Sequence, residues 1–386
     1  MAESIVFTST LTGEVRRFNA LHGKEGGEDY WVAPVEAASP VVVARGGVPD
    51  SEGSVYAGTV HGTIVRLSFE TGEVIGEIPL TEPAEDGYVR SIAYSDGVVY
   101  GMLDSSTLCA VSVADGPLWR VDPDGESSTW LGGPVVADGL VYVAGVGGVY
   151  AFHPDGTPAW ERSWVSAENV TPVVAGGVLY TASFEGAFAL DAKDGAILWE
   201  TGLATNKGHF ALGIAAAGGR VFVNGDTALY ALDAATGAQL WTAEPGADMT
   251  APGVSGGGDA VLVCARGGDG KKYLSSLDAA DGSIRWTSDV PLGAEGELER
   301  VARAVVSVGP VGHAFVTSHD GHVYAFAVSD GWLAWKARIN HTGKSVYPLE
   351  AVASEDPPPL PYPPQANASG CLGLLLAPWR AFRRGS

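Results

Sequence analysis

A repeated segment is the feature of this sequence that most restricts its fold. Three copies share the pattern Leu-Asp-Ala-x-x-Gly-x-x-x-Trp, at residues 190–199, 232–241 and 277–286. A fourth copy, at residues 326–335, has Ala327 where the others have Asp. Four degenerate copies keep the glycine, at Gly23, Gly72, Gly116 and Gly156. The eight glycines lie 39 to 49 residues apart, so the chain is built from eight similar units.

Each unit contains four short segments with the composition of β-strands. In the unit that ends at Trp199, the first three strands are predicted at residues 171–175, 178–181 and 187–190, and the fourth carries the Trp. Short β-rich runs separated by glycine-rich turns indicate an all-β fold. A four-stranded unit of about 40–45 residues is typical of a propeller blade, so we predict an eight-bladed β-propeller.

The residues of the repeat have separate structural roles. Gly195 and its equivalents provide the positive φ that closes the hairpin between the third and fourth strands. The preceding Asp, such as Asp191, accepts hydrogen bonds from the turn backbone. The Trp is suited to pack between neighbouring sheets while its N–H bonds a carbonyl. The second unit has Gly76 where it would carry its Trp. The other seven units each have one Trp that is predicted to dock in this way: Trp31, Trp119, Trp160, Trp199, Trp241, Trp286 and Trp335.

The two ends of the propeller are expected to meet in one blade. The first unit begins at its second strand, at residues 5–8, and therefore lacks an innermost strand. Residues 345–352 follow the last Trp and are predicted to complete that first blade, which removes an open sheet edge. We assign residues 1–353 to the propeller. Residues 354–386 are rich in Pro and are expected to form a disordered tail.

The repeat also resembles a known family. The pattern Asp-x-x-[Thr/Asp]-Gly-x-x-x-Trp is similar to the tryptophan-docking motif of the pyrroloquinoline quinone (PQQ)-like repeat family, over about residues 4–353. That family includes eight-bladed quinoprotein alcohol dehydrogenases and a β-propeller lipoprotein that assists outer-membrane protein assembly. The resemblance implies an eight-bladed propeller. It does not imply the cofactor, since many members are propellers without one.

The residues expected of a quinoprotein dehydrogenase are not apparent. Dehydrogenases of this family carry an adjacent pair of cysteines, a calcium site and a catalytic Asp, whereas the three cysteines here are far apart, at Cys109, Cys264 and Cys371. The first two fall in predicted strands and are expected to be buried thiols. His319 and His322 share a turn that would need a third ligand to hold a metal, and we favour a polar turn. We therefore assign no catalytic, cofactor-binding or metal-binding residue. The alternative is a protein that binds PQQ together with calcium.

Charge and hydropathy restrict the partners and the compartment. The formal net charge is −22, which disfavours binding to the phosphate backbone of nucleic acids. The first residues lack a basic region and a long apolar run, and no stretch of 18 apolar residues occurs. We therefore expect a monomer that has no transmembrane segment. We expect it in the cytoplasm, or outside the cytoplasm if the N-terminus is incomplete.

The loops of one propeller face are the predicted binding surface. These loops connect second to third strands, and fourth strands to the next blade. They carry a polar and aromatic mixture with no obvious reaction in it: Arg90, Asp104, Trp130, Trp164, Glu185, Asn206, His209, Asp226, Lys272 and Arg300. We predict a non-catalytic scaffold or binding module that uses this face to bind a protein partner. The alternatives are a quinoprotein-type dehydrogenase that binds PQQ and a sensor module.

Overall fold

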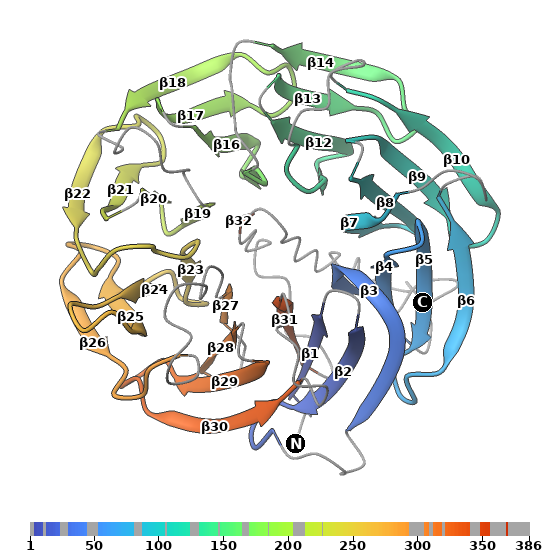
Figure 1. The fold of residues 1–386 in the computed structure, drawn as a ribbon. Coiled ribbons are helices and arrows are strands. Elements are labelled where there is room, and N and C mark those ends of the chain that lie inside the picture. The colour runs from blue at the N-terminus through green and yellow to red at the C-terminus, as the bar shows by residue number, and fades with distance from the viewer. Residues whose placement is uncertain are drawn as a thin grey trace, which may run out of the picture.

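The protein is a ring of antiparallel β-sheets around a common centre (Figure 1). The structure is a computed structural model. No helix within the described residues is long and apolar enough to cross a membrane. The residues that it describes are 4–10, 13–23, 30–44, 53–80, 87–104, 106–123, 131–145, 147–163, 170–183, 185–203, 213–225, 227–292, 305–308, 312–318, 321–339, 348–355 and 368–369.

The residues that the structure describes form seven blades, so the prediction of eight is wrong. The first sheet has seven strands, in the order β31-β1-β2-β3-β4-β5-β6, and takes up two units of the repeat. Its strands are β1 (Ser4–Thr10), β2 (Gly13–Asn19), β3 (Trp31–Ala44), β4 (Ser54–Thr59), β5 (Thr63–Ser68), β6 (Val74–Pro79) and β31 (Pro348–Glu355).

Strand β3 is the reason for the lower number. It is 14 residues long, with the sequence WVAPVEAASPVVVA, and contains no glycine that would end it. Its first half pairs with β2 and its second half with β4, with a register shift between Ala37 and Val41. The outer strand of the first unit thus continues as the inner strand of the second. Each repeat glycine marks one hairpin, and the first sheet contains two of these hairpins. The number of repeat glycines is therefore larger than the number of sheets.

Each of the other six sheets holds one unit, whose strands follow the chain from the centre of the ring outward. The first three are β7 (Val89–Ser95), β8 (Val98–Leu103), β9 (Leu108–Ser112) and β10 (Gly116–Val121); β11 (Val135–Ala137), β12 (Leu140–Gly145), β13 (Gly148–Phe152) and β14 (Pro158–Arg162); and β15 (Val173–Ala175), β16 (Val178–Ala182), β17 (Gly186–Asp191) and β18 (Ile197–Gly202).

The last three sheets complete the ring. They are β19 (Gly213–Ala217), β20 (Arg220–Asn224), β21 (Leu229–Asp233) and β22 (Gln239–Ala243); β23 (Gly253–Val254), β24 (Ala260–Arg266), β25 (Lys272–Asp278) and β26 (Ile284–Thr287); and β27 (Val305–Val308), β28 (His313–Ser318), β29 (His322–Ala327) and β30 (Leu333–Arg338). A short strand from the end of the chain, β32 (Ala368–Ser369), pairs with β19 as a fifth strand.

Hydrogen bonds from the tryptophans tie seven of the eight units to the unit that follows, and the second unit, which has Gly76 in place of a Trp, is the exception. In seven Trp side chains the indole Nε1 donates to a backbone carbonyl, at N···O distances between 2.8 and 3.0 Å. The pairs are Trp31 with Phe69, Trp119 with Pro154, Trp160 with Ala192, Trp199 with Ala234, Trp241 with Ala279, Trp286 with Val328 and Trp335 with Ala20.

The repeat glycine is where each indole packs. At seven of the eight glycines an added Cβ would lie within 2.3–2.7 Å of the docked Trp ring, and φ is positive at each of them. These seven are Gly23, Gly72, Gly156, Gly195, Gly237, Gly282 and Gly331. At Gly116 a Cβ would meet nothing within 4 Å, because the preceding unit has Gly76 in place of its Trp. The glycine is thus needed for the hairpin in every unit and for indole packing in seven.

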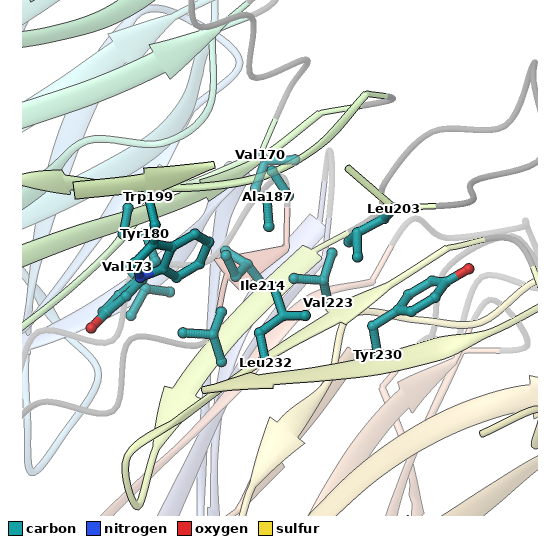
Figure 2. Close-up of a cluster of buried hydrophobic side chains, with 13 residues drawn as sticks. Val170, Val173, Tyr180, Ala187, Trp199, Leu203, Ile214, Val223, Tyr230 and Leu232 are labelled. Carbon is teal, nitrogen blue, oxygen red and sulfur yellow. The ribbon is translucent and has the colours of Figure 1, made fainter. Parts of the chain in front are cut away.

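Apolar side chains fill the space between neighbouring sheets. Figure 2 shows one such cluster, where Trp199 and Tyr180 of one sheet lie with Ile214 and Leu232 of the next. The indole of Trp199 is 7% exposed, and Ile214 and Leu232 are fully buried. Burial of this kind recurs from sheet to sheet, so the ring is a rigid frame for its loops.

The C-terminal strand closes the ring on the first sheet, as the sequence predicted. β31 pairs antiparallel with β1, from Ser4 opposite Glu355 to Ser9 opposite Glu350. A buried Arg17 adds a second tie within this sheet: its Nη1 donates to the carbonyl of Phe69 at 3.2 Å and to a Glu70 carboxylate oxygen at 3.0 Å. Backbone pairing with β31 therefore joins the two ends of the chain, and Arg17 ties the two units of the first sheet together.

Candidate binding face

The structure describes four of the ten residues predicted for the binding face. These four are Arg90, Asp104, Glu185 and Lys272. They belong to three different sheets. The other six lie outside the described residues: Trp130, Trp164, Asn206, His209, Asp226 and Arg300.

Arg90 and Asp104 organise the loops near β7 and β8. The Nη2 of Arg90 donates to the carbonyl of Leu131, a residue that bridges to β12 in the neighbouring sheet. Asp104 follows β8, and its Oδ1 accepts a hydrogen bond from the Tyr88 amide at 3.3 Å. The amide of Asp104 donates in turn to the Tyr88 carbonyl at 3.0 Å. Both side chains therefore form hydrogen bonds with backbone groups of neighbouring loops. Asp104 is also exposed to solvent.

Glu185 lies at the turn between β16 and β17 with its side chain exposed. Its amide donates to the Ser183 hydroxyl at 3.1 Å, and its carbonyl accepts from the Leu203 amide at 3.3 Å. The turn is therefore held by its backbone. The carboxylate extends from a fixed position and is a natural probe of this face.

Lys272 is different, because it is buried. The residue is only 3% exposed, and it stands directly opposite Arg266 where β24 and β25 begin to separate into their loop. Burial lowers the pKa of the Lys272 ammonium, while the nearby Asp248 raises it and Arg266 lowers it further. The Arg266 guanidinium forms an ion pair with Asp248 at 2.5 Å.

Irregular backbone extends this sheet toward the loops. The Ala247 amide donates to the Arg266 carbonyl at 3.1 Å, and the Arg266 amide donates back at 2.7 Å. On the other side, the Leu292 amide donates to the Lys272 carbonyl at 2.8 Å. Asp248 adopts a positive φ of 48°, an uncommon conformation for a residue other than glycine. Arg266 and Lys272 are therefore held between backbone on both sides.

The next sheet around the ring brings two more polar residues to the same end. Ser318 ends β28 and stands opposite His322, which begins β29. The His322 ring lies 6.2 Å from the ring of Tyr324. The other half of the predicted polar turn, His319 with Asp320, lies outside the described residues. In the described part of the chain, no three His, Cys, Asp or Glu side chains come together in a way that would hold a metal ion.

Two cysteines are buried free thiols, as predicted. Cys109 lies in β9 and Cys264 in β24, on sheets that are not neighbours in the ring. Burial raises the pKa of the Cys264 thiol to about 12, so this side chain stays protonated at neutral pH. Cys371 lies outside the described residues.

Sequence reasoning identified Lys272 but missed its companions. The sequence analysis did not single out Arg266 or Ser318, and it treated His322 only as part of a polar turn with His319. The signal that points to them is strand alternation: residues two apart face the same side of a sheet. That rule becomes useful only once the register of β24 with β25 and of β28 with β29 is known.

A model of a known protein family matches most of the repeat region. The family is described as "Outer membrane protein assembly factor BamB", and it matches residues 104–201 and 183–360. The assembly factor BamB of Yersinia pestis is 27% identical over 218 residues, covering 50% of this chain and 53% of the relative. That of Moranella endobia is 28% identical over 186 residues, covering 45% of each. The chain spans about half the length of the curated relatives it matches.

Solved structures share the fold at lower identity. BamB from Moraxella catarrhalis has a TM-score of 0.58 at 19% identity, covering 84% of this chain and 88% of that one. Apo AztD from Citrobacter koseri has a TM-score of 0.61 at 13% identity, covering 92% and 99%. The quinohemoprotein alcohol dehydrogenase ADHIIG from Pseudomonas putida has a TM-score of 0.53 at 16% identity, covering 77% and 68%. These likenesses show the propeller fold alone.

The comparisons also correct the expected compartment. The relatives are named as assembly factors of outer membrane proteins, so the prediction of a cytoplasmic location is wrong. That prediction rested on the composition of a few N-terminal residues, which carries less information than a match through the repeats. Because the family match covers more than half of the chain and runs through the same units that stack into the ring, this chain belongs to the PQQ-like repeat β-propellers, in the family described as outer membrane protein assembly factor BamB.

Proposed function

We propose that this protein is a non-catalytic scaffold whose loop face binds a protein partner, outside the cytoplasm, in the assembly of outer membrane proteins. The family match and the names of the relatives support this role. One structural observation carries it: Trp–carbonyl bonds join seven of the eight units to the unit that follows, so the loops stand on a rigid frame. A rigid frame with variable loops is suited to recognition.

The dehydrogenase alternative fits these residues poorly. The dehydrogenases that the repeat resembles carry adjacent cysteines, whereas Cys109 and Cys264 are buried on separate sheets. The Cys264 thiol is also held in its protonated form by burial, which raises its pKa to about 12. We therefore propose that the protein binds no quinone cofactor. We also propose that it acts as a monomer and that the loop face is its functional surface.

Site-specific photo-crosslinking in the native cell tests the scaffold role. A benzophenone amino acid at Glu185 stands on the exposed loop end of β17, and one at Lys193 stands on the hairpin at the opposite end of the same strand. We expect crosslinks from Glu185 to a component of outer-membrane protein assembly, and far fewer from Lys193. Equal yields from both positions, or no partner from Glu185, would contradict the proposed use of this face.

A further inference from the structure

Two neighbouring sheets pack through an apolar layer that ends below the loops. Cys264 and Leu274 of the sheet β23–β26 lie in one buried cluster with Val316 and Tyr324 of the sheet β27–β30. Figure 1 shows these two sheets side by side. Cys264 stands opposite Leu274, and Val316 stands opposite Tyr324. Each pair therefore faces the other sheet.

The next pair on the same side of each sheet, toward the loops, is polar. In the sheet β23–β26 this pair is Arg266 opposite Lys272. In the sheet β27–β30 it is Ser318 opposite His322. Residues two apart on a strand share a face, so all four lie at the loop end of this interface. The contact between the His322 and Tyr324 rings, at 6.2 Å, agrees with that placement. Three groups that can carry positive charge thus gather in a protein of net charge −22.

Lys272 is the unusual member of this group. Only 3% of the residue is exposed, and the Asp248 carboxylate is a described negative charge that acts on its ammonium and raises its pKa against the effect of burial. Asp248 is engaged with Arg266 at 2.5 Å. The Cys264 thiol lies below Lys272 on the same side and stays neutral, since burial raises its pKa to about 12. Within the described residues, Lys272 and Arg266 therefore share the charge of Asp248, so positive charge exceeds negative charge at this point.

We propose that Lys272, Arg266 and His322 form a binding site for a carboxylate group of a protein partner. An Asp or Glu side chain, or a chain terminus, would supply further negative charge, and ammonium and guanidinium groups bind carboxylates through strong charge-assisted hydrogen bonds. This inference deepens the proposed scaffold function and rests on it. It also accounts for a buried lysine at the loop end of this interface in an otherwise acidic protein.

Glutarate, a small dicarboxylate, is the probe for this site. We expect glutarate at matched ionic strength to raise the Tm of the wild-type protein by about 2 °C or more, because a ligand of the folded state stabilises it by mass action. The Lys272→Met variant removes the charge and keeps the length. Its Tm without glutarate should equal or exceed that of the wild type, and its response to glutarate should be lost. Lys271→Met, which makes the same charge change on the neighbouring residue, should respond as the wild type does.

Other outcomes overturn the inference. If Lys272→Met unfolds at a much lower temperature without glutarate, Lys272 is structural and its charge is already paired. A response to inorganic phosphate without one to glutarate would reject a carboxylate site. Calorimetric titration of glutarate into the wild type and into Arg266→Gln gives a second readout, in which the substitution should weaken binding at least tenfold. If these arms fail while Glu185 still crosslinks to its partner, the scaffold function stands without this site.

Discussion

The indole of Trp335 donates a 2.9 Å hydrogen bond to the carbonyl of Ala20, which joins residues 315 positions apart in the chain. The same ring packs against Gly23 and lies 5.8 Å from the ring of Phe315. The other six docking tryptophans join consecutive units, whereas Trp335 joins the last unit to the first. It is therefore part of the closure of the ring.

Trp335→Ala should lower the free energy of unfolding by about 3–5 kcal/mol, as expected for a large buried aromatic side chain. Trp332 lies three residues earlier and is 72% exposed, so Trp332→Ala should cost under about 1 kcal/mol. Urea denaturation of both variants measures the difference. Equal losses would show that docking at Ala20 contributes nothing beyond an ordinary surface aromatic.

Gly195→Ala should destabilise the protein more than Gly116→Ala. Both glycines have positive φ, of 69° and 90°, so each substitution carries a backbone cost of about 1–2 kcal/mol. At Gly195 the new methyl group would also lie 2.5 Å from the ring of Trp160, whereas at Gly116 it meets nothing. Overpacking adds about 1–3 kcal/mol. Thermal or urea unfolding of the two variants should show that gap, and its absence would argue against indole packing on the glycine.

Removal of residues 340–386 should cause aggregation or a large fall in Tm. The deletion takes away β31, and the edge of β1 then has no partner. A chain that ends at Glu355 keeps β31 and is the matched control, with a Tm expected within a few degrees of the full chain. Light scattering and calorimetry distinguish the two. If both truncations behave alike, pairing with β31 is not what stabilises the closed ring.

The stability of the wild type should rise with pH relative to that of Lys272→Met. Burial lowers the pKa of Lys272 in the folded state below its ordinary value of 10.5. Between the lowered pKa and 10.5 the unfolded state binds more protons, so stability increases as pH increases through that window. The groups that face Lys272 are Asp248, Arg266 and Cys264. Urea denaturation of both proteins between pH 7 and 10 gives the difference, and a constant difference would exclude a lowered pKa.

Titration with PQQ and calcium should give no binding, and dye reduction with small alcohols should give no turnover. A tricarboxylated quinone needs a divalent cation and several convergent polar groups. The net charge of −22 repels it unless such groups intervene. Micromolar binding with turnover would replace the scaffold proposal with the dehydrogenase alternative. Binding alone would make the protein a carrier or sensor of the quinone.

The candidate site shows where sequence reasoning stopped. Lys272 was predicted on the loop face because it lies between the second and third strands of its unit, which is a local feature. Its importance depends on Arg266 across the strand pair, and on His322, which comes from another sheet 50 residues later. No spacing in the chain predicts that meeting. It follows from the register of two hairpins and from the way their sheets pack.

The sequence by itself determined the repeat, the all-β propeller and the identity of the docking tryptophans. Those features are encoded within single units, where a Gly, an Asp and a Trp at constant spacing repeat the same local physics. Only the tertiary structure decided the number of sheets and the polar group above the apolar layer. Whether β3 ends after Trp31 or continues to Ala44 depends on its pairing with β2 and β4 together. Pairing between units is a long-range competition that hairpin signals do not report.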